Sequence, residues 1–185
     1  MNRRTKIAAL AAALLITAGG AGSAAVASGD GRGAHREAAA LTGTAKLYRP
    51  AGDDITFSFD AHLAAKDNMN PQAATGTFWF SHYRDGKGGK AAVKVDCLVT
   101  GGKVAVVTGR VTETDVKEFE GARVGVSVHD LGGRDRLGYS WMTQDPDKGD
   151  VPPCQTAPPF EKVKAGTGDF RVLPWLPEYE QPAAR

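Results

Sequence analysis

The feature of this sequence that most constrains its fold is a pair of apolar runs separated by two glycines. The stretch 91–111 reads AAVKVDCLVTGGKVAVVTGRV, and two-residue glycine loops suit the tight turns that join antiparallel strands. With Gly101 and Gly102 as the loop, Val99 faces Val104. Because side chains alternate between the two faces of a strand, we expect one apolar face on this hairpin, made of Val93, Val95, Cys97, Val99, Val104 and Val106.

Short β-type runs continue on both sides of this hairpin. They are separated by Gly, Pro, Asp and Asn, which is typical of an all-β protein, and no internal repeat is present. We therefore expect a single antiparallel β-sandwich or barrel domain, residues 41–174, with about 8 strands. Apart from the hairpin, the expected strands are 45–48, 55–62, 76–83, 123–130, 137–143 and 169–173, with turns or loops at 84–90, 112–121 and 145–159.

Residues 1–27 have the three parts of a secretory signal peptide. They are a basic start, an apolar run at 7–18 and small residues before Ser28. The apolar run is shorter than the roughly 18 residues of a membrane span, so we expect no span. A flexible lead-in at 28–40 and a proline-rich tail at 175–185 complete the expected organisation.

The net charge of the chain excludes one class of partner. All 185 residues carry 23 Lys and Arg against 21 Asp and Glu, a formal charge of +2. The signal peptide holds three of the basic residues and no acidic one, so the secreted chain has a formal charge of −1. We expect no binding to nucleic acid, because such binding needs a strong positive balance.

The two cysteines, Cys97 and Cys154, are expected to form a disulfide bond. Exported chains fold under oxidising conditions, where an even number of cysteines favours a bridge. Two separately buried thiols are the alternative. The bond would tie the hairpin to the proline-rich segment that precedes the last strand.

Several of these segments resemble secreted actinobacterial proteins of unknown function, some of which are called repetin. The resemblance covers nearly the whole secreted chain and implies an all-β extracellular domain, without implying an activity or a functional residue. The residues that carry it are 55–61 (ITFSFDA), 74–76 (ATG), Cys97-Leu98, Ala105, Gly109, Pro153-Cys154 and Gly168-Asp169.

A catalytic interpretation depends on Ser127, His129 and Asp130. Ser127 and His129 lie two residues apart and so share one face of a strand, and His129 with Asp130 could form an orienting pair for general base catalysis. The sequence around Ser127 lacks the second glycine and the following helix of a nucleophile elbow. An outward polar face explains these residues better, so we assign no catalytic residue and keep a secreted hydrolase as an alternative.

His82 shares the strand parity of Phe78 and Phe80, and an imidazole on an apolar face could be a ligand or a base. The alternative is a histidine at the edge of the core with one satisfied hydrogen bond.

Asp145, Asp147 and Asp150 imitate a calcium-binding loop, but Thr156 stands where the closing glutamate is needed. The chain has neither a His-x-His nor a His-Glu-x-x-His spacing. We expect no metal site and no cofactor.

Four aromatic residues, Trp79, Tyr83, Tyr139 and Trp141, are the candidate ligand-binding residues. Aromatic rings on the surface of a sheet can stack on sugar rings or other flat ligands, whereas burial in the core is the alternative. Strand 76–83 carries aromatic residues on both faces, which predicts that both faces are covered.

Three functions follow from these observations. We expect a secreted, non-catalytic binding or structural module of the cell envelope or extracellular space, with polysaccharide as a candidate partner. A hydrolase instead needs a histidine and a carboxylate within hydrogen-bond distance in a concave pocket. A small-ligand β-barrel needs an apolar cavity of about 300 Å³ or more.

Overall fold

A computed structural model describes residues 37–140 and 151–176 of the chain. The expected signal peptide, Trp141 and the three aspartates at 145–150 lie outside the described residues. Within them the regular structure is β-strand apart from three single-turn 3-10 helices, which confirms the predicted all-β class.

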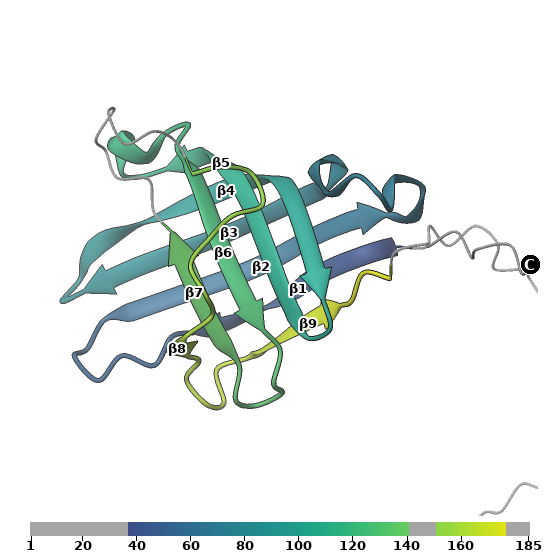
Figure 1. Ribbon diagram of the computed structural model, residues 1–185. Coiled ribbons are helices and arrows are strands. Elements are labelled where there is room, and N and C mark those ends of the chain that lie inside the picture. The colour runs from purple at the N-terminus through teal and green to yellow at the C-terminus, as the bar shows by residue number, and fades with distance from the viewer. Residues whose placement is uncertain (1–36, 141–150, 177–185) are drawn as a thin grey trace, which may run out of the picture. The chain divides into compact units, whose positions relative to one another are not determined.

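The described strands form one antiparallel sheet with the order β8-β7-β6-β5-β4-β3-β2-β1-β9 (Figure 1). It has nine strands rather than the expected eight because the two-residue strand β8 was not foreseen. The strands are β1 (Glu37–Lys46), β2 (Asp54–Ala64), β3 (Thr75–Arg84), β4 (Lys87–Gly101), β5 (Val104–Thr114), β6 (Arg123–His129), β7 (Arg136–Ser140), β8 (Glu161–Lys162) and β9 (Asp169–Leu173). The 3-10 turns are η1 (Ala65–Asp67), η2 (Pro71–Ala73) and η3 (Lys117–Phe119).

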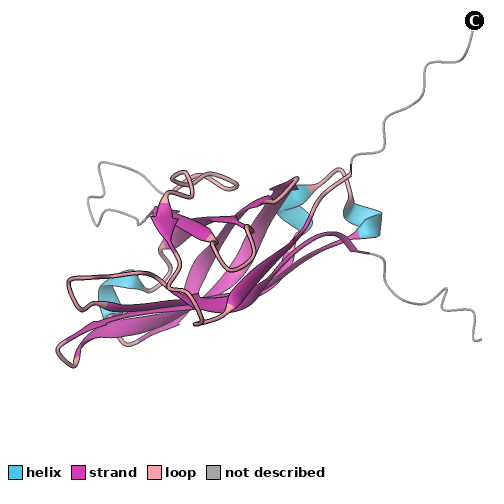
Figure 2. Ribbon diagram, turned by 90° about the horizontal axis from the view of Figure 1, so that it is seen from below, coloured by secondary structure: helices cyan, strands magenta, loops and turns pink. Residues whose placement is uncertain are grey.

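The sheet curls into a half-barrel, which Figure 2 shows from below. At one end the curl closes, because the chain that follows β8 pairs with the end of β1. Leu47 and Val163 form an antiparallel bridge, and the backbone N–H of Tyr48 donates to the carbonyl of Lys162 at 2.8 Å. The inner face of the half-barrel becomes the hydrophobic core.

Aromatic rings fill the centre of this core. The alternation predicted for 55–62 is confirmed, since Ile55, Phe57, Phe59 and Ala61 are all buried. The ring of Phe57 packs 5.8 Å from that of Phe80, and Phe59 meets Phe170 of β9 edge-on at 5.4 Å. Strand β9, the last in the sequence, is therefore held by the same cluster as the first strands.

The predicted apolar face of the central hairpin is wrong in part, because a β-bulge divides it. Asp96 is the extra residue, between the pairs Val95–Gly109 and Cys97–Thr108. Val93 and Val95 face the core as expected, but beyond the bulge the side chains exchange faces. The core residues there are Leu98, Thr100, Ala105 and Val107, whereas Val99, Val104 and Val106 point outward and are half-buried.

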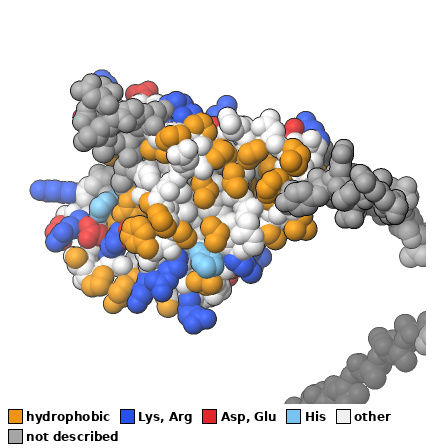
Figure 3. All heavy atoms as spheres, viewed as in Figure 1, with side chains coloured by type: hydrophobic (Ala, Val, Ile, Leu, Met, Phe, Trp, Pro, Cys, Tyr) orange, Lys and Arg blue, Asp and Glu red, His pale blue; other side chains and the backbone are white. Residues whose placement is uncertain are grey.

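The predicted hairpin loop is also displaced by one residue. Gly101 pairs with Val104, so the two-residue turn is Gly102-Lys103, with Gly102 at φ +55°. Figure 3 shows apolar side chains on the outer face that carries the end of this hairpin, in agreement with the outward orientation of its valines.

Both ends of the described domain reach beyond the predicted boundaries. Strand β1 begins at Glu37, within the expected lead-in, and its Ala39 is fully buried. At the other end Trp175 packs against the core, and its backbone N–H donates to the hydroxyl of Thr100 at 2.7 Å. Trp175 thus fixes the chain after β9.

A strap, residues 151–160, crosses the outer face of β5, β6 and β7 (Figure 1). The predicted disulfide between Cys97 and Cys154 is confirmed, with a Cα–Cα distance of 5.4 Å. The strap also forms hydrogen bonds with hydroxyls of the sheet. The N–H of Cys154 donates to Thr108 at 3.1 Å, and the N–H of Ala157 donates to Ser140 at 2.9 Å.

Two aspartates in the loop between β6 and β7 bind the backbone of β9. Asp135 accepts from the N–H of Phe170 at 2.8 Å, and Asp130 accepts from that of Val172 at 3.3 Å. Burial raises the pKa of Asp135, an effect that its backbone hydrogen bonds offset only in part and that nearby Asp169 reinforces. Burial also acts on Asp130, but hydrogen bonds from Lys103 and from backbone N–H groups outweigh it and lower its pKa.

These two aspartates should make opposite contributions to the pH dependence of stability. Relative to an Asp135→Asn variant, the wild type should lose free energy of unfolding as the pH rises above about 4, because a raised folded-state pKa favours the protonated form. Relative to Asp130→Asn, the wild type should lose stability as the pH falls below about 4. Urea unfolding of the three proteins across this pH range measures both differences, and a common direction would contradict the assignment.

The disulfide should stabilise the domain without determining its strands. With a sequence separation of 57 between the cysteines, the chain-entropy model gives up to about 4 kcal/mol. The Cys97→Ser/Cys154→Ser variant should therefore melt at a lower temperature than the oxidised wild type while keeping its far-ultraviolet circular dichroism. Identical melting of the oxidised protein and the variant would show that the strap contributes nothing through this bond.

Candidate functional site

The residues of the hydrolase hypothesis do not form a catalytic group. Ser127 is 1% exposed and donates its hydroxyl to the carbonyl of Ala157 in the strap at 2.6 Å. Asp130 binds Lys103 at 3.1 Å as well as the backbone of β9. His129 lies on β6 between its sheet partners Val104 and Arg136. The strap therefore occupies the surface on which a Ser127 nucleophile would meet its substrate.

The structure separates the candidate aromatic residues. Tyr139 belongs to the core, with its ring 5.7 Å from Phe57 and its hydroxyl accepting from Arg49 at 3.1 Å. Trp79 lies on the opposite, outer face of the sheet and is 43% exposed. Tyr83 shares that face, since it lies four residues further along β3.

The expectation that strand 76–83 is covered on both faces is wrong. Phe78 and Phe80 are buried on the inner face of β3, whereas Trp79 and Tyr83 are exposed or half-buried on the other. The sheet is a single layer here, and the strap lies over β5 to β7 and not over β3. The outer face of β3 is thus open to a ligand.

A hollow of about 630 Å³ surrounds Trp79 on this outer face. Trp79 of β3 pairs with Ala92 of β4, which in turn pairs with Glu113 of β5. The small side chain of Ala92 therefore lies between the Trp79 ring and the Glu113 carboxylate. Lys90, Thr114 and Asp115 complete the polar part of the lining. We refer to this hollow as the outer hollow.

Charged side chains lie on the same face of the sheet as Trp79. Lys90 and Lys94 are exposed and lie two residues on either side of Ala92, so both share its face. Within the described residues, neither the Glu113 carboxylate nor the Lys90 ammonium has an ion-pair partner. These groups are therefore available to hydrogen-bond a ligand held against Trp79.

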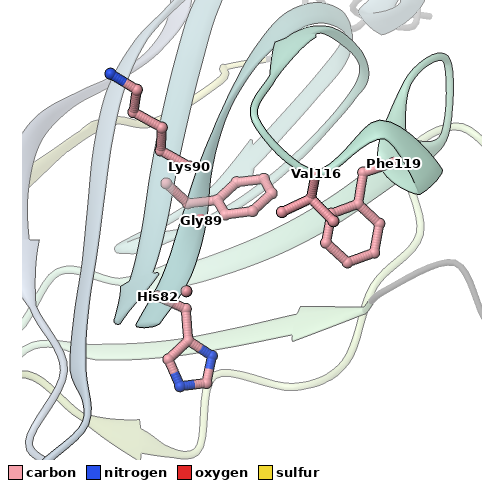
Figure 4. Close-up of a pocket in the computed structure, with 7 residues that line it drawn as sticks. His82, Gly89, Lys90, Val116 and Phe119 are labelled. Atoms are coloured by element: carbon pink, nitrogen blue, oxygen red, sulfur yellow. The ribbon is translucent and has the colours of Figure 1, made fainter. Parts of the chain in front are cut away.

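A second hollow of about 410 Å³ lies on the inner face at the same end of the β3–β4 hairpin. Phe80, Val116 and Phe119 line its apolar part, with His82 at its edge. In Figure 4, Val116 and Phe119 lie on one side, His82 lies on the other, and the side chain of Lys90 points away. We refer to it as the inner hollow.

His82 at this edge is held by a carboxylate. Its Nε2 lies 2.8 Å from Oδ1 of Asp53, in the turn before β2. The hydrogen bond from His82, opposed by burial and aided by Arg84, holds the pKa of Asp53 below its usual value. The single hydrogen bond matches the expected alternative, but the His82 side chain is 51% exposed, so it lies further from the core than expected.

Asp53 was not among the residues predicted from the sequence. The available signal was the Gly-Asp-Asp turn before strand 55–62, because antiparallel pairing brings the start of β2 beside the end of β3. The distance in sequence, 29 residues, hides this pairing until the register is known.

Two further observations limit the chemistry of the described residues. No group of three or more His, Cys, Asp or Glu within them has the arrangement of a metal site. None of their helices is long and apolar enough to cross a membrane.

Comparison with known proteins gives no assignment for these hollows. No protein-family model matches the chain, and neither curated proteins nor solved structures gave a match. The function therefore has to be argued from the geometry.

Replacing Gly138 should show how closely the strap covers the sheet. A Cβ at Gly138 would lie 2.0 Å from the carbonyl oxygen of Pro158, whereas one at Gly133 would meet nothing within 4 Å. Gly138→Ala should therefore lower the free energy of unfolding by about 2 kcal/mol or more, and Gly133→Ala should change it by less than about 0.5 kcal/mol. Urea unfolding measures both, and equal stability of the two variants would contradict the close contact.

Proposed function

We propose that this protein is a secreted, non-catalytic module of the cell envelope or extracellular space that binds polysaccharide in the outer hollow. The observation that carries the proposal is the position of Trp79. Trp79 is 43% exposed on the outer face of the sheet, within a hollow of about 630 Å³. A large aromatic side chain that the fold leaves in solvent is available to bind a ligand.

The chemistry around Trp79 is complementary to a sugar ring. A sugar presents C–H groups on its faces, which pack on an indole, and hydroxyls at its rim, which donate and accept hydrogen bonds. Glu113 accepts such bonds and Lys90 donates them, and both line the same hollow as Trp79. The outer hollow therefore offers a flat surface with polar groups at its edge.

The position of Tyr83 favours a chain of sugars over a single one. Tyr83 lies four residues from Trp79 on β3, about 13 Å along the strand. Both side chains are on the outer face, with Ser81 between them. A polymer that follows β3 would contact both rings.

Several features support a location outside the cell. The first 27 residues have the composition of a secretory signal, and the Cys97–Cys154 bond suits an oxidising compartment. The resemblance to secreted actinobacterial proteins points the same way. A non-catalytic role is supported by the position of Ser127, whose hydroxyl is bonded to the strap.

Replacing Trp79 tests this function. We expect the purified protein to bind insoluble cell-wall polysaccharide in a sedimentation assay, and Trp79→Ala to weaken the binding about tenfold, as expected for a lost ring contact of about 1.4 kcal/mol. Trp79 is exposed, so the variant should keep the wild-type melting temperature.

Tyr48→Ala provides the control, since Tyr48 is 54% exposed but lies outside the outer hollow. It should bind like the wild type. Equal binding by the Trp79 and Tyr48 variants would refute the proposed surface, and no binding to any cell-wall or extracellular polysaccharide in a panel would refute the function.

A further inference from the structure

We propose that the inner hollow is a second binding site, which holds one small aromatic molecule carrying a hydroxyl group, that is, a phenol. It lies on the opposite face of β3 from Trp79 and is independent of the polysaccharide function. Three properties of the hollow support this assignment: its size and lining, its shape, and the hydrogen-bonding state of His82.

The size and lining suit a small apolar ligand. A volume of about 410 Å³ falls within the range of about 300–1,000 Å³ that is usual for small-molecule sites. Phe80, Val116 and Phe119 supply aromatic and aliphatic surface, against which an aromatic ring packs well. The inner hollow also meets the cavity size expected for a small-ligand β-protein.

Two glycines give the hollow its shape. Gly89 pairs with His82 on the neighbouring strand, and a Cβ there would lie 2.4 Å from Cγ2 of Val116. Gly88 has φ +148°, which side chains rarely adopt, and a Cβ there would lie 1.9 Å from the carbonyl oxygen of His82. The strand beside His82 therefore has no side chains to fill the space.

The pairing of His82 with Asp53 selects the polar group of the ligand. The Asp53 side chain is 17% exposed, and its carboxylate lies 2.8 Å from Nε2 of His82, whose side chain is 51% exposed. A carboxylate accepts only, so neutral His82 donates its Nε2–H to Asp53 and keeps a lone pair on Nδ1. No described residue bonds to Nδ1. A ligand that reaches it must bring a donor.

The other charged residue of the lining does not favour an anionic ligand. The side chain of Lys90 points away from the inner hollow (Figure 4). A carboxylate in the hollow would therefore lose its hydration without gaining a cation. A phenolic hydroxyl combines the apolar ring that the walls require with the single donor that His82 can accept.

The experiment compares p-cresol with toluene, which has the same ring and methyl group but no hydroxyl. The purified protein is titrated with each by NMR at pH 8. We expect saturable binding of both, with p-cresol about fivefold tighter, as one neutral hydrogen bond gives.

Three variants assign this difference to the residues. His82→Phe keeps a ring but removes the acceptor, so p-cresol should bind no more tightly than toluene. Val116→Trp fills the hollow and should abolish binding of both. His62→Phe is the control outside the hollow, because His62 also contacts carboxylates, Asp60 at 2.8 Å and Glu37 at 2.7 Å. It should bind both compounds as the wild type does.

The Trp79→Ala variant distinguishes binding in the inner hollow from binding of polysaccharide in the outer hollow. Trp79→Ala should leave p-cresol binding unchanged even if it loses polysaccharide. The proposal would be overturned if p-cresol showed no saturable binding. It would also be overturned if His82→Phe still bound p-cresol more tightly than toluene, or if His62→Phe lost this difference in affinity. Thermal melting of each variant confirms folding, and if Val116→Trp fails to fold, the His82 comparison still decides.

Discussion

The edges of the sheet are the constraint on which the rest of this structure depends. An unpaired edge strand exposes a row of backbone N–H and C=O groups, and β9 has such an edge. Asp130 and Asp135 supply acceptors for two of its N–H groups, while the Leu47–Val163 bridge closes the curl nearby. Phe170 of β9 can then pack on Phe59, which completes the core from the inside. Two carboxylates in one loop thus determine where the last strand lies and where the half-barrel ends.

The bulge at Asp96 allows the long hairpin to carry the disulfide on its outer face and core residues on its inner face. Without an extra residue, the side chains of Val93, Val95, Cys97 and Val99 would all face the core, and Cys97 would lie beside Val95. The bulge turns Cys97 outward, toward the strap, and the Asp96 carboxylate accepts from Thr108 at 2.7 Å and from Arg123 at 2.8 Å. The carboxylate of the bulge residue, Asp96, therefore has hydrogen-bond partners for both of its oxygens. The inner face continues with Leu98 and Thr100, so the core does not lose contacts where the disulfide forms.

The sequence allowed the fold class, most strands and the disulfide to be predicted, because each depends on local alternation, turn residues or compartment. The errors arose where one residue changes the register. The local sequence does not show that Asp96 forms a bulge. Because of this bulge, Val99, Val104 and Val106 point outward and not into the core as predicted. Of the four candidate aromatics, parity placed Trp79 and Tyr83 together correctly, but it could not show which face was covered. The pairing of His82 with Asp53 depends on the register between β2 and β3, which no local pattern contains.

The location of both hollows follows from where the strap covers the outer face of the sheet. Over β5 to β7 the strap lies so close that Gly125 and Gly138 have no room for a Cβ, and this part of the sheet is closed to ligands. Around β3 and the start of β4 the sheet is a single layer, so Trp79 faces solvent while Phe80 and His82 face inward. Here the core ends before the strands do, and η3 covers the inner face only in part, through Val116 and Phe119. A strand pair that extends past its own core thus offers two surfaces, one with charged side chains beside an indole and one with apolar side chains beside an imidazole.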